Sequence, residues 1–199
     1  MSASVPAGEA PTTVAGRPPG VRERILDAAT ALFYEHGIGA TSADRIIEQV
    51  GITKVTFYRH FRTKADLVVA YLQRQAAGEE EAFGAVRAAG DAHEALRALA
   101  FGIGDWSCRP GFRGCPFINA AAEFPDAAHP VRAVVDAHRT WLLDLFAGIA
   151  ADAGADAADA GRALMMLRDG AMVTGYLGDP QTVGETLHRA FLAVVDGRR

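Results

Sequence analysis

The 199-residue sequence has only two cysteines, only two lysines and few aromatic residues, and it contains no long uncharged apolar run. Two cysteines are too few for a disulfide scaffold, so both are read as reduced thiols. No stretch approaches the roughly 18 apolar residues that a membrane span needs. The first twenty residues also lack the basic start and apolar core of a secretory signal. We therefore expect a cytoplasmic protein that does not enter a membrane.

Half of the residues are apolar and the net charge is only -4, which excludes a chain that is disordered throughout. The length predicts one large or two small domains. Charge is unevenly distributed, because residues 1–75 carry nine basic and seven acidic side chains whereas residues 76–199 carry eleven and seventeen. Both lysines lie in the first part. This asymmetry weakly indicates an anionic partner for the N-terminal end.

Apolar residues recur at helical spacing along the chain, and no period-two alternation competes with that pattern. We predict an all-α fold of about nine helices, with three short helices followed by a bundle of longer ones. The predicted helices cover 21–37, 42–50, 53–60, 63–88, 91–106, 117–124, 128–153, 157–176 and 181–196. The predicted domains are a disordered tail over 1–20, a small helical domain over 21–75 and a larger helical body over 76–199.

Residues 41–64 carry the pattern of a helix-turn-helix. Thr41 is expected to cap the first helix, and Gly51 stands where a helix ends in the left-handed conformation. Thr53 is expected to cap the second helix. Ile52 and Phe57 have the spacing of a hydrophobic staple, which fixes the angle at which the chain enters that helix.

The second helix of this pair has two distinct faces. Phe57 and Phe61, four residues apart, are expected to point into the core of the small domain. Val55 and Arg59 fall on the opposite face, and Lys54 lies in the first turn, where a recognition helix contacts bases. An ordinary surface helix would show the same spacing, so periodicity leaves both interpretations open.

The run from Arg24 to Leu67 resembles the DNA-binding domain of the tetracycline-repressor (TetR) family of bacterial transcription regulators. The matching residues are Ile25, Ala28, Leu32, Phe33, Gly37, Thr41, Ile46, Gly51, Thr53, Thr56, Tyr58, His60, Phe61, Lys64 and Leu67. Val55 stands where the family commonly has a small residue. That departure bears on which operator sequence is read and not on DNA binding itself.

The resemblance implies a double-stranded DNA partner with a pseudo-palindromic operator, and it implies roles for individual residues. Lys54, Val55 and Thr56 are expected to face bases, and Tyr58, His60 and Lys64 to clamp phosphates. Thr41 and Ser42 are expected to approach the DNA backbone. His60 has the alternative of packing on the next helix. The expected DNA-binding set is Thr41, Ser42, Thr53, Lys54, Val55, Thr56, Tyr58, Arg59, His60 and Lys64.

For the body, the resemblance implies a helical domain that binds a ligand and forms a homodimer through the helices at 157–176 and 181–196. Their small-residue and leucine faces are the expected dimer contacts, with burial inside one protomer as the alternative for each residue. These faces contain Ala163, Leu164, Leu167, Ala171 and Gly175 on the first helix, and Leu187, Ala190, Phe191 and Val194 on the second.

A ligand pocket needs apolar walls and a few placed polar groups. The candidates are Trp106, Phe112, Phe117, Asn119, Glu123, Phe124, Trp141, Met165, Met166, Met172 and Tyr176. Asn119 and Glu123 stand one helical turn apart in an apolar segment, which makes them the candidate polar anchors. Each candidate has the alternative of a place in the core. We expect a largely apolar small-molecule effector.

Cys108 and Cys115 bracket a short loop that also contains Arg109 and Arg113. The two arginines could lower the pKa of a neighbouring thiol and create a reactive thiolate. A repressor that senses oxidants or electrophiles through these cysteines is therefore an alternative function. Buried, unreactive thiols are the simpler interpretation.

Other function classes have little support in the sequence. His93, His129 and His138 show no compact ligand spacing with the cysteines, so no metal or other cofactor is expected. An enzyme with a cysteine nucleophile and His129 as base is a remote alternative that rests on composition alone. The sequence favours a ligand-responsive repressor that is not an enzyme.

Overall fold

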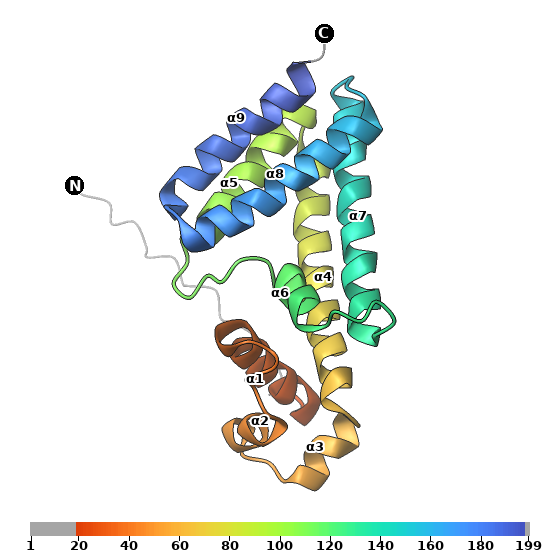
Figure 1. Cartoon of the computed structure of the whole chain (residues 1–199), viewed down its shortest axis with the longest axis vertical. Helices are drawn as coiled ribbons and strands as arrows, with labels where there is room; N and C mark the ends of the chain where they lie inside the picture. Colours follow the sequence, from red (N-terminus) through yellow and green to blue (C-terminus); the bar gives the residue numbers. More distant parts are fainter. Residues whose placement is uncertain (1–18, 198–199) are drawn as a thin grey trace, which may run out of the picture.

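The computed structural model describes residues 19–197, and these fold into nine α-helices and one 3₁₀ turn without any strand (Figure 1). The all-α prediction is therefore confirmed for the described residues, and most of the predicted tail lies outside them. The elements are α1 (Val21–His36), α2 (Ala43–Val50), α3 (Lys54–His60), α4 (Lys64–Ala89), α5 (Ala92–Ser107), α6 (Pro116–Glu123), α7 (Pro130–Asp152), α8 (Ala157–Leu177), η1 (Pro180–Thr182) and α9 (Val183–Asp196).

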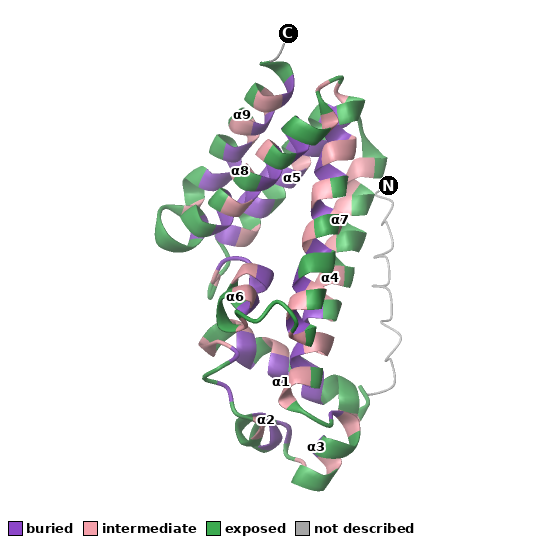
Figure 2. Ribbon diagram, turned by 45° about the vertical axis from the view of Figure 1, so that its right-hand side comes forward, coloured by how far each residue is buried: buried purple, intermediate pink, exposed green. Residues whose placement is uncertain are grey.

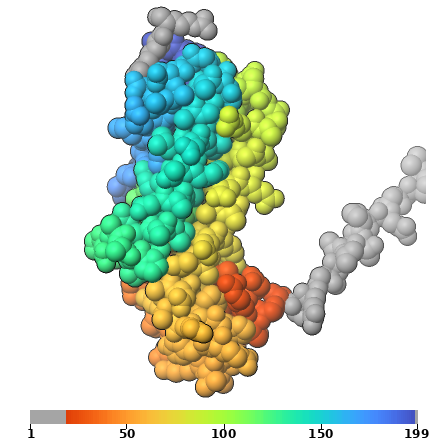
Figure 3. Space-filling model, turned by 90° about the vertical axis from the view of Figure 1, so that its right-hand side faces the viewer, coloured from red at the N-terminus to blue at the C-terminus, as the bar shows by residue number. Residues whose placement is uncertain are grey.

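Helices α1 to α3 form a small unit at one end of the molecule, and α4 runs from it into the body (Figures 1 and 3). The start of α4 is fixed by a capping box. The Thr63 hydroxyl accepts a hydrogen bond from the Asp66 amide, and the Asp66 carboxylate accepts one from the Thr63 amide. Gly78 and Gly84 do not interrupt the helix. Helix α4 therefore connects the small unit to the body without interruption.

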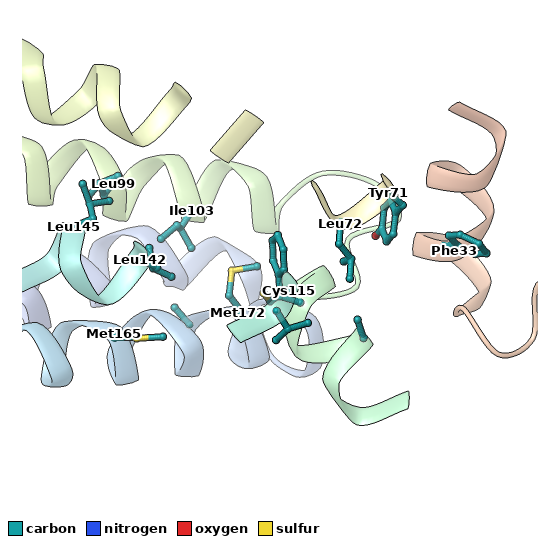
Figure 4. Packing of buried hydrophobic residues seen from close by; sticks show 14 of the residues in the cluster. Phe33, Tyr71, Leu72, Leu99, Ile103, Cys115, Leu142, Leu145, Met165 and Met172 are labelled. Atoms are coloured by element: carbon teal, nitrogen blue, oxygen red, sulfur yellow. The ribbon is translucent and has the colours of Figure 1, made fainter. Parts of the chain in front are cut away.

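The core continues from the small unit into the body without a break. Figure 4 shows Phe33 of α1 and Tyr71 of α4 at one end of the cluster and Leu145 of α7 near the other. The rings of Phe33 and Tyr71 meet edge to face at 5.6 Å between centroids. Farther along, α5 and α9 approach so closely that a Cβ at Gly104 would lie 2.8 Å from the Gly184 backbone. The two parts of the chain thus pack as one structure.

The faces that were expected to form a dimer lie largely inside the protomer. Leu164, Gly175, Leu187 and Phe191 are buried, so the internal alternative is correct for these residues. For the half-buried residues Ala163, Leu167, Ala190 and Val194 the dimer contact stays a prediction, because both faces of α8 carry apolar residues and helical spacing does not tell which one packs inward. Within residues 19–197, every helix is too short or too polar to cross a membrane.

Candidate DNA-binding surface and ligand pocket

The helix-turn-helix is built by local signals in the sequence. Gly51 ends α2 with φ 70° and ψ 45°, the left-handed conformation that favours glycine. Thr53 caps α3 by accepting a hydrogen bond from the Thr56 amide. Both predictions are confirmed. The turn between Gly51 and Thr53 therefore fixes how α3 is presented.

The cap of α2 is Ser42 and not Thr41 as predicted. Ser42 accepts a hydrogen bond from the Arg45 amide at 3.2 Å. The Thr41 side chain is fully buried, and its hydroxyl donates to the carbonyl oxygens of Leu32 and Gly37. With its hydroxyl used inside the fold, Thr41 does not present that group to DNA as the sequence suggested. Both residues are good caps, so propensity did not separate them.

Helix α3 buries one face and exposes the other (Figure 2). Phe57 and Phe61 are buried, with ring centroids 6.4 Å apart, as predicted. On the outward side, Val55 is 80% and Tyr58 is 47% exposed. Arg59 is exposed as well. The Tyr58 ring meets that of Phe57 edge to face at 5.2 Å between centroids, but much of Val55 and Tyr58 remains open to a partner.

Of the predicted DNA-binding residues, all except Thr41 reach the surface of this unit at least in part. Those exposed are Ser42, Thr53, Lys54, Val55, Tyr58 and Arg59, and those half-buried are Thr56, His60 and Lys64. Arg62, which the prediction left out, is exposed in the turn between α3 and α4. The sequence could have predicted this residue, because it lies two positions after the expected end of the second helix of the helix-turn-helix.

The two lysines of this surface have different electrostatic surroundings. Lys54 pairs with Asp44 of α2 at 2.9 Å, and the hydrogen bond between them raises the pKa of Lys54. Lys64, the first residue of α4, is half-buried. Burial lowers the pKa of Lys64, whereas the negative charge of Glu123 in α6 opposes that decrease. Lys64 is therefore electrostatically linked to the body.

The residues predicted to line one ligand pocket are dispersed. Phe117, Met165 and Met172 are buried in the core, and Met166 is 74% exposed on α8. Trp141 is half-buried and packs near Phe83. For Met165 and Met172 the core alternative applies, whereas Met166 lines a groove between α8 and α9. Adjacent methionines on a helix point to different sides, which the spacing did not resolve.

Asn119 and Glu123 line a cavity together with Tyr176, and both also bind backbone groups at the junction with the small unit. The Glu123 carboxylate accepts hydrogen bonds from the amides of Ile38, at 2.9 Å, and Gly39. The Asn119 side-chain amide donates to the Arg113 carbonyl at 2.9 Å. Sequence spacing correctly put Asn119 and Glu123 on one side of α6 but did not show what they meet.

Tyr34 and Arg113 add to the same junction. The Tyr34 hydroxyl accepts from the Arg113 amide at 2.9 Å and donates to the Gly114 carbonyl at 3.1 Å. The Arg113 guanidinium donates to the Glu35 carbonyl and lies 5.7 Å from the ring centroid of Tyr176. Burial raises the pKa of Tyr34, which therefore stays protonated and able to donate. A cavity of about 230 Å³ lies among these residues.

A larger pocket, of about 390 Å³, lies between α4 and α5. Its walls include Phe83, Leu99, Ile103 and Trp106, with Glu79 and Arg109 as its charged members. Of the predicted ligand residues, Trp106 alone lines it. The volume falls within the range of about 300–1,000 Å³ that small-molecule sites occupy. We refer to it as the α4–α5 pocket.

Behind the α4–α5 pocket, Glu79 belongs to a buried cluster of charged groups. Its carboxylate accepts from Nη2 of Arg168 at 2.8 Å and lies 2.9 Å from Nε2 of His138. Arg168 is 1% exposed and also pairs with Asp169 at 3.3 Å. Burial raises the pKa of Glu79, but His138 and Arg168 outweigh it and lower that pKa overall. The sequence analysis missed this cluster, which joins α4, α7 and α8.

The two cysteines are free thiols in different surroundings. Cys115 is buried beside Met172 (Figure 4), and Cys108 is exposed. Among residues 19–197, no three His, Cys, Asp or Glu side chains gather where they could hold a metal ion. The thiol-sensing alternative stays a prediction, with Cys108 the thiol that an oxidant would reach first.

Two family models match the chain. The model described as bacterial regulatory proteins of the tetR family matches residues 25–71, and the tetracyclin repressor-like C-terminal domain matches residues 92–162. A solved TetR-family transcriptional regulator from Streptomyces coelicolor is 44% identical, with a TM-score of 0.85, over 89% of this chain and 95% of that one. The chain belongs to the TetR family.

The chain also matches more distant transcriptional regulators. A transcriptional regulator from Streptomyces avermitilis is 25% identical with a TM-score of 0.77, over 89% of this chain and 99% of that one. The transcriptional activator FasR of Mycolicibacterium smegmatis is 30% identical over 142 residues, which are 68% of this chain and 62% of FasR. A Staphylococcus aureus regulator is 43% identical over 53 residues, 27% of this chain and 29% of its own. The matches thus span less than two thirds of these two curated relatives.

As a TetR-family member, the protein is a DNA-binding transcriptional regulator, and the helix-turn-helix formed by α2 and α3 is its DNA-binding element. The family consists of regulators and not of enzymes. The predicted family, fold class and general function are therefore confirmed.

Proposed function

We propose that the protein acts in the cytoplasm as a homodimeric repressor that leaves a pseudo-palindromic operator when a small molecule binds its body. The observation that carries the proposal is the hydrogen-bonded junction between α6 and the segment after α1, together with a ligand-sized pocket in the body. A ligand can change operator affinity only if it binds the two conformations unequally. The junction supplies a physical connection through which the body can bias the position of the DNA-binding unit.

On the DNA side, we propose that Lys54, Val55 and Thr56 face bases and that Tyr58, His60 and Lys64 contact phosphates. The base-facing residues are supported by the exposure of the outer face of α3. The phosphate-contacting residues are supported by their place in the second half of α3 and at the start of α4. Ser42 and Thr53 stand at helix N-termini, where backbone amides attract phosphate. Arg59 is exposed on the same face as Val55 and completes the proposed surface.

The DNA assignment is tested by Lys64→Ala. Each lost phosphate contact removes about 0.9 from the slope of log affinity against log salt, so a dimer should lose about 2. Affinity for specific and nonspecific DNA should fall together, because a phosphate contact carries no base information. The measurement is a fluorescence-anisotropy titration at several salt concentrations, using DNA from the intergenic region next to the gene.

Arg97→Ala is the matched control, since Arg97 is an exposed cation on α5, away from the DNA-binding unit. It should leave the salt slope unchanged. An unaltered affinity and slope for Lys64→Ala would contradict the phosphate role. A pure protein that shifts no intergenic fragment at all would argue against the proposed operator near its own gene.

For the dimer, we propose an interface centred on the exposed apolar row of α8. Met166 is 74%, Val173 is 49% and Leu177 is 76% exposed, and with Gly170 they follow one line along the helix. Beside this row, α8 and α9 enclose a groove of about 240 Å³. Apolar side chains exposed together in this way mark interaction surfaces. A second copy fits because a two-fold dimer places the same row on both partners.

The dimer proposal predicts that Met166→Glu combined with Leu177→Glu yields a folded monomer. Each partner would have to bury two carboxylates in the interface, and taking a charged group out of water is unfavourable. The measurement is multi-angle light scattering after size exclusion, with helical content followed by circular dichroism. Val55→Glu combined with Tyr58→Glu, a pair exposed on α3, is the control that should remain dimeric. A dimer in both variants would exclude α8 as the interface.

A further inference from the structure

The α4–α5 pocket carries two charged side chains, and they differ in how far their charge is already compensated. Glu79 stands on α4, and Arg109 follows the end of α5. Between them the walls are apolar, with Phe83, Leu99 and Trp106 among the side chains that line the space. The side chain whose charge has no partner within the protein determines which ligand head group the pocket binds.

The negative charge of Glu79 is used within the protomer. One carboxylate oxygen accepts from Arg168 at 2.8 Å, and the other lies 2.9 Å from Nε2 of His138. Arg168 cannot turn to solvent to release Glu79, because it is 1% exposed and is held by Asp169 as well. A cation entering the pocket would therefore meet a carboxylate whose charge is already balanced.

Arg109 is in the opposite situation. Its guanidinium forms no ion pair and donates no hydrogen bond to any residue within 19–197, although the residue lines the pocket. An arginine is charged at every physiological pH, and its planar head binds carboxylates through two parallel hydrogen bonds. The pocket thus has an apolar interior and one uncompensated positive charge at its edge.

We propose that the α4–α5 pocket binds an amphipathic carboxylate. The apolar part of the ligand packs against Phe83, Leu99 and Trp106, and its carboxylate accepts hydrogen bonds from Arg109. An alcohol of the same shape leaves the charge of Arg109 unused, and an amine is repelled by it. The link from this binding to operator release rests on the proposed function, whereas the binding itself does not.

Three probes with the same alkyl chain separate these cases: decanoate, decan-1-ol and decylamine. Binding is followed near neutral pH by tryptophan fluorescence in a Trp141→Phe background, where Trp106, which lines the pocket, is the remaining tryptophan, and below the concentrations at which the probes aggregate. We expect decanoate to bind about tenfold more tightly than decan-1-ol, because an exposed charge-assisted pair contributes at the modest end of its range. Decylamine should bind most weakly.

Arg109→Gln should abolish the preference for decanoate and leave the affinity for decan-1-ol unchanged. Arg97→Gln, which removes an exposed arginine of α5 outside the pocket, is the matched control and should keep the preference. The proposal is overturned if decan-1-ol or decylamine binds as tightly as decanoate, if none of the three binds, or if the preference survives in Arg109→Gln.

Operator binding is measured separately, so that the two proposals can fail independently. If decanoate binds through Arg109 but leaves operator affinity unchanged, the pocket assignment holds and effector control through it fails. If another compound releases the operator while decanoate does not bind, effector control holds and the carboxylate assignment fails.

Discussion

Replacing Glu79 by alanine is expected to lower the free energy of unfolding by about 3–5 kcal/mol, the cost of removing one partner from a buried ion pair. The side chain of Arg168 is 1% and that of Glu79 is 12% exposed, so the substitution leaves the Arg168 guanidinium buried without its Glu79 partner. Asp169 remains near Arg168 at 3.3 Å but is itself shared with Arg139. The measurement is urea unfolding at one fixed protomer concentration, because dimerisation would add to the apparent stability.

Glu80→Ala is the matched control, since Glu80 is the next residue of α4 and is exposed. It should change stability little. Adding Arg168→Met to Glu79→Ala should recover part of the loss, because it removes the unpaired buried charge. A Glu79→Ala variant as stable as the control would show that Arg168 does not depend on Glu79.

The same cluster predicts how this contribution varies with pH. The pKa of Glu79 in the folded protein lies below its ordinary value of 4.5. A depressed carboxyl pKa stabilises the fold above the ordinary value, and this stabilisation is lost as the pH falls through the folded pKa. The difference between the original protein and Glu79→Ala should therefore shrink as the pH falls below about 4.5.

The DNA-binding unit was predictable because its signals are local. Gly51, Thr53 and Phe57 lie within seven positions of one another, and each acts on its own turn or helix. The choice between Thr41 and Ser42 as a cap was wrong because both residue types cap well. Tertiary packing decided that choice by burying Thr41.

The body was predictable only as a set of helices. Glu79 meets partners 59 and 89 residues away, and no spacing rule connects positions so far apart. The same holds for Glu123, whose partners stand 85 and 84 residues earlier. A polar residue in an apolar segment indicates that a partner exists. It does not tell whether that partner is a ligand, a buried charge or the backbone of another domain.

Glu123 also connects the body with the DNA-binding unit, whatever its part in binding a ligand. It accepts hydrogen bonds from the Ile38 and Gly39 amides, and its charge acts on Lys64. Glu123→Gln removes the charge and offers only one acceptor oxygen to two amides. If these bonds transmit the ligand signal, a compound that releases the original protein from its operator should still bind the variant but release it poorly.

The expected size of this effect follows from typical couplings of about 1–3 kcal/mol, which correspond to a change of about 5- to 150-fold in operator affinity. In Glu123→Gln the ratio of operator affinities without and with the ligand should fall towards one. Hydrogen exchange at the Ile38 and Gly39 amides should become faster. Asp144→Asn, which removes an exposed carboxylate of α7, is the charge-matched control and should keep both properties. If the ligand releases Glu123→Gln from operator DNA as readily as it releases the control, the coupling runs through other contacts, most directly along α4.

If Glu123→Gln binds the operator poorly even without ligand, Glu123 instead positions the DNA-binding unit, because the defect then does not depend on the ligand.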